Sequence, residues 1–160
     1  MKIVVNLAEQ RLDLLDDDGA PMRSWPVSTA ANGAGEAIGS GCTPRGEHVV
    51  RAKIGADMPL NTVFVGRRPT GEIYTPELGE WEPERDWILS RILWLSGKEP
   101  GRNRLGAQDT MRRYIYIHGT PDEGFVPEPK SHGCIRMRNQ DLVELFDLVP
   151  VYTAVEICEG

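Results

Sequence analysis

Lys2-Ile3-Val4-Val5-Asn6-Leu7 and Gln10-Arg11-Leu12-Asp13-Leu14-Leu15 both place an apolar side chain at every second position. A period of two is typical of a strand that buries one of its faces. Asp16-Asp17-Asp18-Gly19 follows the second run with residues that favour a turn. The beginning of the chain therefore predicts a β-hairpin, and it makes a mostly β fold the expected class.

The rest of the chain continues this pattern. Further strands are expected at residues 22–28, 47–54, 62–66, 113–117 and 151–157. Two stretches predict helices instead. Apolar residues recur at helical spacing in Arg85–Ser96, and Gly97 stands where a glycine would end a helix. Asp141–Leu148 is expected to form a short helix capped by Asn139. Many short strands with few helices predict a mostly antiparallel sandwich or barrel.

Length, charge and cysteine content narrow the class of protein. The 160 residues fit one domain, expected to span 1–160. A net charge of −6 disfavours nucleic acid as a partner. The sequence contains no run of 18 apolar residues, so no membrane-spanning helix is predicted. The three cysteines, Cys42, Cys134 and Cys158, lack a disulfide-like spacing and suit a reducing compartment.

Chemistry-bearing side chains gather in one region near the C-terminal end. Ile117-His118-Gly119-Thr120 precedes Ser131-His132-Gly133-Cys134-Ile135-Arg136, so two of the three histidines and one cysteine fall within seventeen residues. A thiol becomes a strong nucleophile when an imidazole accepts its proton. Gly133 allows a sharp turn beside Cys134, so nearby backbone N–H groups are expected to stabilise an oxyanion. The combination predicts acyl transfer.

Positive charge near Cys134 also supports a reactive thiol. Lys130, Arg136 and Arg138 contribute +3 within nine residues that contain no acid, although the whole chain carries −6. Such a local field is expected to lower the pKa of the Cys134 thiol and to attract a substrate that bears a carboxylate.

These motifs resemble a known family. The string Ser131-His132-Gly133-Cys134-Ile135-Arg136, with His118-Gly119-Thr120 upstream and Thr43-Pro44-Arg45-Gly46 far upstream, is similar to the L,D-transpeptidase catalytic domain, or YkuD family. The resemblance covers nearly the whole chain. It implies a β-sandwich-like fold with mixed sheets and one or two short helices.

The resemblance also implies an activity and a set of roles. Cys134 is expected to attack the carbonyl before the terminal D-alanine of a peptidoglycan tetrapeptide stem and to form a thioester. His118 is the expected general base, and the carbonyl of Gly119 orients it. The roles of oxyanion and substrate binding fall to Ser131, His132, Gly133 and Arg136. No cofactor is implied, and carbapenem-type β-lactams are expected inhibitors.

Other interpretations remain open at this point. Cys134 could be an inert buried thiol, or could join His118 and His132 in a zinc site, although a fourth ligand is not evident. Arg136 could pair with Asp141 or Glu144 rather than bind substrate. A catalytically silent peptide-binding module is the rival function. His48 and Cys42 are interpreted as structural residues, and most of the tryptophans as core or wall.

The outcome of the reaction depends on the acceptor of the acyl group. Without an export signal near Met1, the cytoplasm is the expected location, and a removed signal would make it the periplasm. Free murein peptides in the cytoplasm favour hydrolysis, so an L,D-carboxypeptidase of murein recycling is preferred to a cross-linking L,D-transpeptidase.

Residues 80–106 are interpreted as an insertion with a tryptophan-bearing helix. They are expected to form a wall or lid over the substrate groove.

Overall fold

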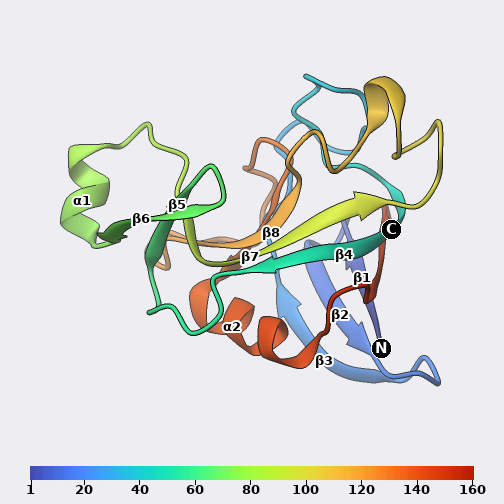
Figure 1. The fold of residues 1–160 in the computed structure, drawn as a ribbon, viewed down its shortest axis with the longest axis horizontal. Helices are drawn as coiled ribbons and strands as arrows, with labels where there is room; N and C mark the ends of the chain where they lie inside the picture. The colour runs from blue at the N-terminus through green and yellow to red at the C-terminus, as the bar shows by residue number, and fades with distance from the viewer.

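The computed structural model describes all residues, 1–160, and contains ten strands and two α-helices. In chain order they are β1 (Lys2–Asn6), β2 (Arg11–Leu15), β3 (Pro21–Pro26), β4 (Gly46–Ile54), β5 (Thr62–Val65), β6 (Arg68–Ile73), α1 (Pro76–Trp81), β7 (Ile88–Gly97), β8 (Tyr116–Thr120), β9 (Ile135–Arg138), α2 (Asn139–Leu148) and β10 (Ala154–Cys158). A short 3-10 helix covers Gly106–Gln108. Figure 1 shows α1 beyond the β5–β6 hairpin at one end and both chain termini toward the other.

All ten strands belong to one curled, mixed sheet. Its order is β3-β2-β1-β10-β4-β7-β5-β6, with β8 and β9 branching from β7. The β1–β10 and β8–β9 pairs are parallel, and the others are antiparallel. The mostly β prediction is confirmed. Seven of the nine strand pairs are antiparallel, as the residue pattern predicted, and the two parallel pairs make the sheet mixed, as the family resemblance implied.

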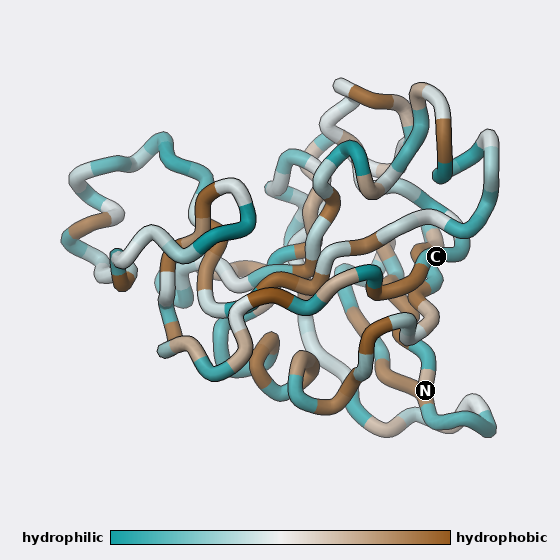
Figure 2. Tube along the Cα trace, viewed as in Figure 1, coloured by the Kyte–Doolittle hydropathy of each residue, from teal (hydrophilic) through white to brown (hydrophobic).

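The core lies between the curled sheet and α2. Nineteen buried side chains form its main cluster, among them Ile3 and Val5 of β1, Leu12 and Leu14 of β2, and Leu142, Leu145 and Phe146 of α2. The apolar positions of the first hairpin therefore face inward, as their period of two predicts. In Figure 2 the hydrophobic parts of the chain trace follow the strands and α2, and the hydrophilic parts follow the loops.

The helix predicted for Arg85–Ser96 is wrong, because this stretch contains β7, the longest strand. Residues 88–89 pair with β5 and residues 92–97 with β4, while β8 lies along the other edge. Strands on both edges and burial on both faces leave most positions of β7 buried, with apolar residues at six of its ten positions, and such a run has no period of two. Gly97 is not a helix cap. A Cβ there would lie 2.1 Å from the backbone oxygen of Asn103, so glycine permits a close approach of two segments.

Residues 80–106 are consequently not an insertion that could be removed, since β7 is central to the sheet. Only the first part of this range forms a wall: Asp86 and Ile88 line the hollow described below. The tryptophan-bearing helix expected in this range does not form, because Trp87 precedes β7 and Trp94 lies within it. The helix that is present, α1, ends at Trp81, a residue that is 85% exposed.

Smaller differences concern the ends of elements. The strand expected at 113–117 is shifted, because β8 covers Tyr116–Thr120. Asn139 does not cap α2 but is its first residue, and the side chain of Asp122 accepts a hydrogen bond from the Asn139 N–H at 3.1 Å. Patterning did not predict β6, α1 or β9. No helix is both long and apolar enough to span a membrane.

Candidate active site

Two neighbouring parallel strands bring the predicted site residues together. The register of β8 and β9 places Ile117 opposite Ile135 and His118 opposite Arg136. Because side chains alternate along a strand, the two isoleucines enter the core while His118 and Arg136 share the other face. Cys134 stands one residue before β9 and lies beside Tyr116. The parallel pairing thus joins two motifs that are separated in the sequence.

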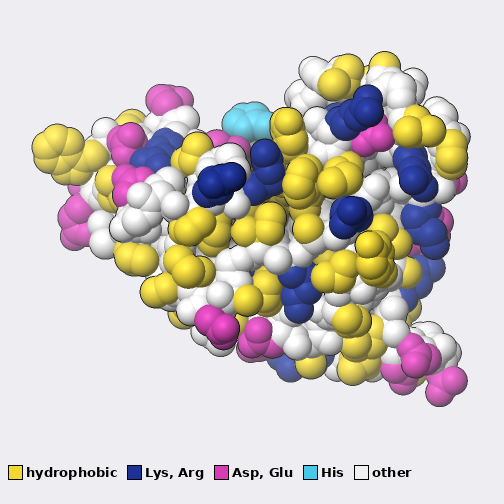
Figure 3. Space-filling model, in the orientation of Figure 1, with side chains coloured by type: hydrophobic (Ala, Val, Ile, Leu, Met, Phe, Trp, Pro, Cys, Tyr) yellow, Lys and Arg dark blue, Asp and Glu magenta, His cyan; other side chains and the backbone are white.

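This face forms the floor of a hollow of about 370 Å³. Such a volume is in the usual range for small-molecule sites. Figure 3 shows the surface notched between the part that contains α1 and the part above the β7 strand end. The lining residues are Gly66, Arg67, Asp86, Ile88, Arg113, Tyr114, Ile115, Tyr116, His118, Ser131, His132, Cys134 and Arg136.

The thiol of Cys134 is half-buried in this hollow and is held by backbone groups. Its Sγ accepts a hydrogen bond from the Tyr116 N–H at 3.3 Å and donates one to the Tyr114 carbonyl at 3.4 Å. Burial raises the pKa of Cys134 to about 12, and the nearby Arg136 and Arg113 only partly oppose it. The expectation from the sequence that the thiol pKa is lowered is therefore wrong.

The expected contribution of three cations is reduced by the fold. Of Lys130, Arg136 and Arg138, only Arg136 lines the hollow that contains Cys134. The guanidinium of Arg138 lies over the ring of Phe125, and Lys130 lines a neighbouring hollow. The three cations are close in sequence, but the fold places only one of them in the hollow that contains Cys134.

His118 is buried, with one ring nitrogen engaged by the backbone. Its Nδ1 lies 2.6 Å from the carbonyl oxygen of Gly119. A carbonyl oxygen can only accept, so Nδ1 carries a proton and Nε2 of the neutral ring is the basic nitrogen. Burial lowers the pKa of His118, which favours the neutral imidazole. The hollow therefore contains a neutral imidazole and a protonated thiol.

Gly119 is required by packing as well as by its carbonyl. A Cβ at this position would lie 2.3 Å from Asn139 Oδ1 and 2.5 Å from the backbone oxygen of Leu89. Both distances are far too short for real atoms. The Asn139 side chain is itself held, because its Nδ2 donates to the Thr120 carbonyl at 2.8 Å. The carbonyl that orients His118 thus belongs to a closely packed segment.

Ser131 and Gly133 shape the loop that presents Cys134. The Ser131 hydroxyl donates to the Cys134 carbonyl at 2.5 Å and accepts from the Gly133 N–H at 3.2 Å. Thr43 of the upstream motif donates to the Gly133 carbonyl at 2.9 Å. Gly133 has φ +132°, a backbone conformation that favours glycine. These contacts link the two motifs, and they occupy the Gly133 N–H, which was expected to be an oxyanion donor.

His132 and Arg136 occupy different positions in the hollow. The side chain of His132 is exposed and has no hydrogen-bond partner in the protein. Arg136 Nη2 forms an ion pair with Asp86 Oδ1 at 3.2 Å. Arg136 therefore does pair with an acid, but the acid is neither Asp141 nor Glu144. No group of three or more His, Cys, Asp and Glu side chains is placed to hold a metal ion.

Three charged residues that line the hollow, Asp86, Arg67 and Arg113, were not predicted from the sequence. Asp86 and Arg136 line both the hollow that contains Cys134 and a second one of about 230 Å³. Arg67, at the β5–β6 turn, and Arg113, just before β8, add two cations. The Gly66-Arg67 pair could have marked a hairpin turn. No local signal places that turn beside Cys134.

His48, interpreted above as a structural residue, is held inside the fold by two hydrogen-bond contacts. His48 is fully buried, with its Nδ1 at 3.0 Å from the Gly46 carbonyl and its Nε2 at 3.0 Å from the Thr110 hydroxyl. Of the four tryptophans, Trp25 and Trp87 are buried, Trp94 is half-buried and Trp81 is exposed.

Comparisons with known proteins identify the family and the fold. A family model described as "YkuD: L,D-transpeptidase catalytic domain" matches residues 1–157. Two curated relatives come from Escherichia coli strain K12. The probable L,D-transpeptidase YbiS is 30% identical over 112 residues, which is 67% of this chain and 35% of YbiS. The probable L,D-transpeptidase ErfK/SrfK is 30% identical over 165 residues, covering 98% of this chain and 44% of that protein.

A solved structure shows the same fold. L,D-transpeptidase 3 from Mycobacterium tuberculosis, in complex with a faropenem-derived adduct, superposes with a TM-score of 0.56 at 15% sequence identity and covers 97% of this chain and 58% of that one. The chain thus spans less than half the length of the two curated relatives. Because the family model matches residues 1–157, this chain belongs to the YkuD family of L,D-transpeptidase catalytic domains.

Proposed function

We propose that the chain is a cysteine-dependent acyl-transfer enzyme that acts on the L,D-peptide bond of peptidoglycan tetrapeptide stems. The observation that carries the proposal is the placement of Cys134 and His118 in one hollow, with Nδ1 of His118 engaged by the Gly119 carbonyl. This contact leaves Nε2 as the basic nitrogen. A silent peptide-binding module would not need a neutral imidazole and a thiol in the same hollow.

The proposed acylation begins with proton transfer from the Cys134 thiol to Nε2 of His118. The sulfur forms a bond to the carbonyl carbon of the L-centre as the carbonyl π electrons move to oxygen. When the tetrahedral intermediate collapses, the C–N bond breaks and His118 returns the proton to the departing amine of D-alanine. The product of this half-reaction is a thioester on Cys134.

The oxyanion needs donors that are not already engaged. The Gly133 N–H donates to Ser131, and the Tyr116 N–H donates to the sulfur. The backbone N–H groups of His132 and Cys134 have no acceptor within the protein. We assign the oxyanion to the Cys134 N–H, with Ser131 and Gly133 acting on the shape of the loop.

The charge of the hollow supports a substrate with carboxylates. Arg67, Arg113 and Arg136 line it, whereas Asp86 is its one acidic residue. The chain as a whole carries −6, so this surface differs from the average. An anionic stem peptide fits such a local field.

The second half-reaction determines which type of enzyme this is. Attack of water on the thioester releases a tripeptide, and attack of an amine yields a cross-linked or exchanged peptide. In both cases His118 takes a proton from the attacking group and the sulfur leaves as the thiol. We keep hydrolysis, as an L,D-carboxypeptidase of murein recycling, as the proposed outcome. The names of the relatives favour the amine as the alternative acceptor.

The proposed compartment is the cytoplasm. Support comes from the three cysteines, which are free thiols, the state that a reducing compartment maintains. We also propose that β-lactams of the carbapenem type acylate Cys134, because a strained lactam carbonyl presents the same electrophile as the scissile amide. The adduct carried by the M. tuberculosis relative supports this reaction class.

The function is tested by incubating the purified protein with a synthetic tetrapeptide stem and analysing products by mass spectrometry. Tripeptide and free D-alanine are expected with water alone. A second stem peptide or a free D-amino acid is then added as acceptor. Dimer or exchanged tetrapeptide as the main product at modest acceptor concentration would reverse the proposed outcome. Equal turnover by the Cys134→Ala variant would reject the mechanism itself.

A further inference from the structure

Arg67 lies at the tip of a hairpin that reaches the catalytic hollow. Val65 pairs with Arg68, so Gly66 and Arg67 form a two-residue turn between β5 and β6. The turn lines the same hollow as Cys134. The hairpin therefore places a cation at the wall of the site, at a point that neither catalytic motif occupies.

The backbone at Arg67 is unusual for an arginine. Gly66 has φ +56° and Arg67 has φ +64°, so both turn residues are in the left-handed region. Tight hairpins of this kind favour Asn-Gly or Gly-Gly because those residues adopt positive φ at low cost. An arginine there pays a conformational penalty, and such outliers often mark a functional position.

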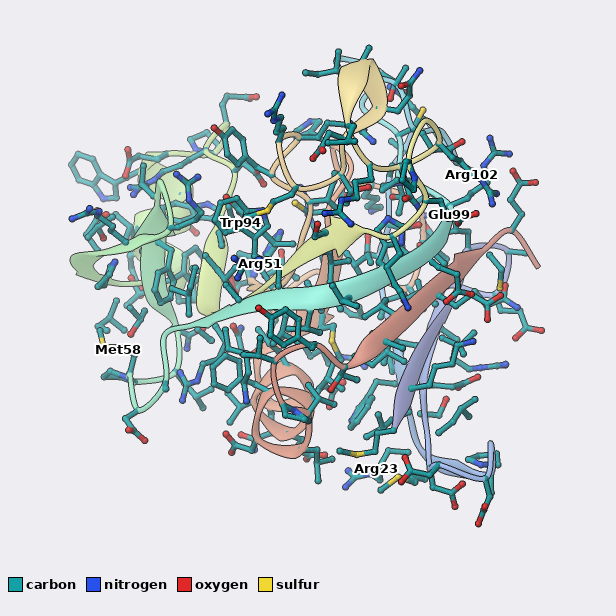
Figure 4. All side chains as sticks on the ribbon, turned by 45° about the vertical axis from the view of Figure 1, so that its right-hand side comes forward. Arg23, Arg51, Met58, Trp94, Glu99 and Arg102 are labelled. Atoms are coloured by element: carbon teal, nitrogen blue, oxygen red, sulfur yellow. The ribbon has the colours of Figure 1, made fainter.

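Aromatic rings hold the Arg67 side chain in place. Its guanidinium carbon lies 4.9 Å from the ring centre of Trp94 and 4.7 Å from that of Tyr114. Its Nη1 donates to the Tyr116 hydroxyl at 3.1 Å. Trp94, labelled in Figure 4, projects from β7. A guanidinium that is already oriented loses less conformational freedom when it binds a ligand.

The other two arginines of the hollow are already engaged. Arg113 uses its Nη groups on the backbone oxygens of Gly35, Glu36 and Cys42 and on the Ser40 hydroxyl. Arg136 is paired with Asp86, and its Nε is buried without a partner. Arg67 forms no ion pair, and its only hydrogen bond within the protein is the one to Tyr116. Arg136 also makes a single side-chain hydrogen bond, but to the carboxylate of Asp86, so among these three residues only Arg67 carries a charge that neither a carboxylate nor a set of carbonyl oxygens in the protein already engages.

Tyr116 connects Arg67 to the nucleophile. Its backbone N–H contacts Cys134 Sγ at 3.3 Å, and its hydroxyl contacts Arg67 at 3.1 Å. In a peptide, the terminal carboxylate lies one residue beyond the scissile carbonyl, a span of about 3.3–3.6 Å along the chain. Tyr116 extends from Cys134 Sγ to Arg67, and this separation is long enough for one residue of substrate with Cys134 at its carbonyl carbon and Arg67 at its carboxylate.

We propose that Arg67 binds the terminal carboxylate of the amino acid that leaves when Cys134 is acylated, and that it thereby selects peptides with a free C-terminus. This inference rests on the proposed function and assigns a substrate group to Arg67 instead of Arg136. A guanidinium and a carboxylate can form two parallel hydrogen bonds, which distinguishes the acid from the neutral amide.

The test compares a tetrapeptide that ends in D-alanine with the same peptide ending in D-alaninamide. For the wild-type protein, kcat/KM is expected to be about tenfold to a hundredfold higher for the free acid, as for a charge-assisted hydrogen bond. Arg67→Gln should lower kcat/KM for the acid by a similar factor and leave the amide nearly unchanged. Arg68→Gln, on the exposed neighbour outside the hollow, is the matched control and should keep the preference.

Two further measurements separate binding from folding. Melting temperatures show whether Arg67→Gln remains folded, and Arg67→Lys, which keeps the charge but loses the planar fork, should retain part of the preference. Binding of both peptides to the Cys134→Ala variant should show the same selectivity without turnover.

Three results would overturn the inference. Equal kcat/KM for acid and amide in the wild type would remove the carboxylate site while leaving the proposed reaction intact. Loss of the preference in Arg136→Lys but not in Arg67→Gln would move the site to Arg136. Absence of turnover with either peptide would reject the proposed function, and the role of Arg67 with it.

Discussion

Ser90, within β7, donates a hydrogen bond to Asn139 at the start of α2, with an Oγ to Oδ1 distance of 2.5 Å. The same Ser90 hydroxyl accepts from the Asn61 N–H at 2.9 Å. Ser90 has φ +72° at a point where the β7–β8 register shifts. This irregularity lies directly behind Gly119, because Asn139 Oδ1 is the atom that a Cβ on Gly119 would meet.

Substitutions at Ser90 should separate backbone strain from hydrogen bonding. Ser90→Ala keeps the strained backbone and removes the partner of the buried Asn139 Oδ1 and of the half-buried Asn61 N–H, so a loss of about 1–3 kcal/mol in unfolding free energy is expected. Ser90→Gly loses the same bonds but relieves about 1 kcal/mol of strain. Urea unfolding should therefore rank wild type above Ser90→Gly and Ser90→Gly above Ser90→Ala. A glycine variant as stable as the wild type would contradict the contribution of the hydrogen bonds.

Removal of the nucleophile or the base should abolish turnover with little effect on folding. Cys134→Ala is expected to be inactive, and His118→Ala should lose several orders of magnitude in kcat/KM, because the two groups act as a unit. Intact-mass measurement after exposure to a carbapenem should show one adduct on Cys134. Cys42→Ala is the control and should react like the wild type. An adduct on Cys42 would argue against the proposed nucleophile.

The pH dependence of activity should reflect an imidazole of His118 and a thiol of Cys134 that are both uncharged before the reaction. Burial lowers the pKa of His118, so the basic imidazole persists below pH 6.5 and the acid limb of kcat/KM should lie below that value. Burial raises the pKa of Cys134 to about 12, so alkylation of its thiol in the free protein should show no titration near pH 8.5. A thiol that titrates well below 8.5 would instead indicate a thiolate–imidazolium pair.

The stability of the fold should decrease in acid because of His48. Burial lowers the pKa of His48 to about 4, from 6.5 for the free side chain. A lowered histidine pKa means that the unfolded state binds the proton first. The stabilisation is therefore complete above pH 6.5 and is lost as the pH falls toward 4, by about 3 kcal/mol in total.

His48→Gln provides the control for this titration. The glutamine side chain offers an amide in place of the imidazole but does not titrate. Melting temperatures between pH 7 and pH 4 should fall less steeply for the variant than for the wild type. Parallel curves for the two proteins would show that other groups, such as His118, dominate the acid sensitivity.

Several elements could be predicted from local pattern alone. The alternation in residues 2–7 and 10–15 predicted β1 and β2 because each strand has one face in the core. Residues 151–157 predicted β10 for the same reason. A period of two reports burial on one face, so it is informative wherever a strand has one buried and one more exposed face.

β7 could not be predicted in this way. Its burial on both faces removes the alternation, and the spacing of its apolar residues then imitated a helix. The capping prediction for α2 failed for a related reason. Asn139 contacts Ser90 and Thr120, which are distant in sequence, so its polar group serves the tertiary structure rather than the local helix end.

By itself, the sequence determined the mostly β class, the resemblance carried by Ser131–Arg136, and the pairing of a cysteine with a histidine as the chemistry-bearing residues. These follow from local periodicity and from the residue types that the reaction needs. Only the tertiary structure decided that burial keeps Cys134 protonated, that Asp86 pairs with Arg136, and that the β5–β6 turn places Arg67 in the same hollow as Cys134. Desolvation and long-range strand pairing depend on neighbours that are distant along the chain, and no local pattern encodes which neighbours those are.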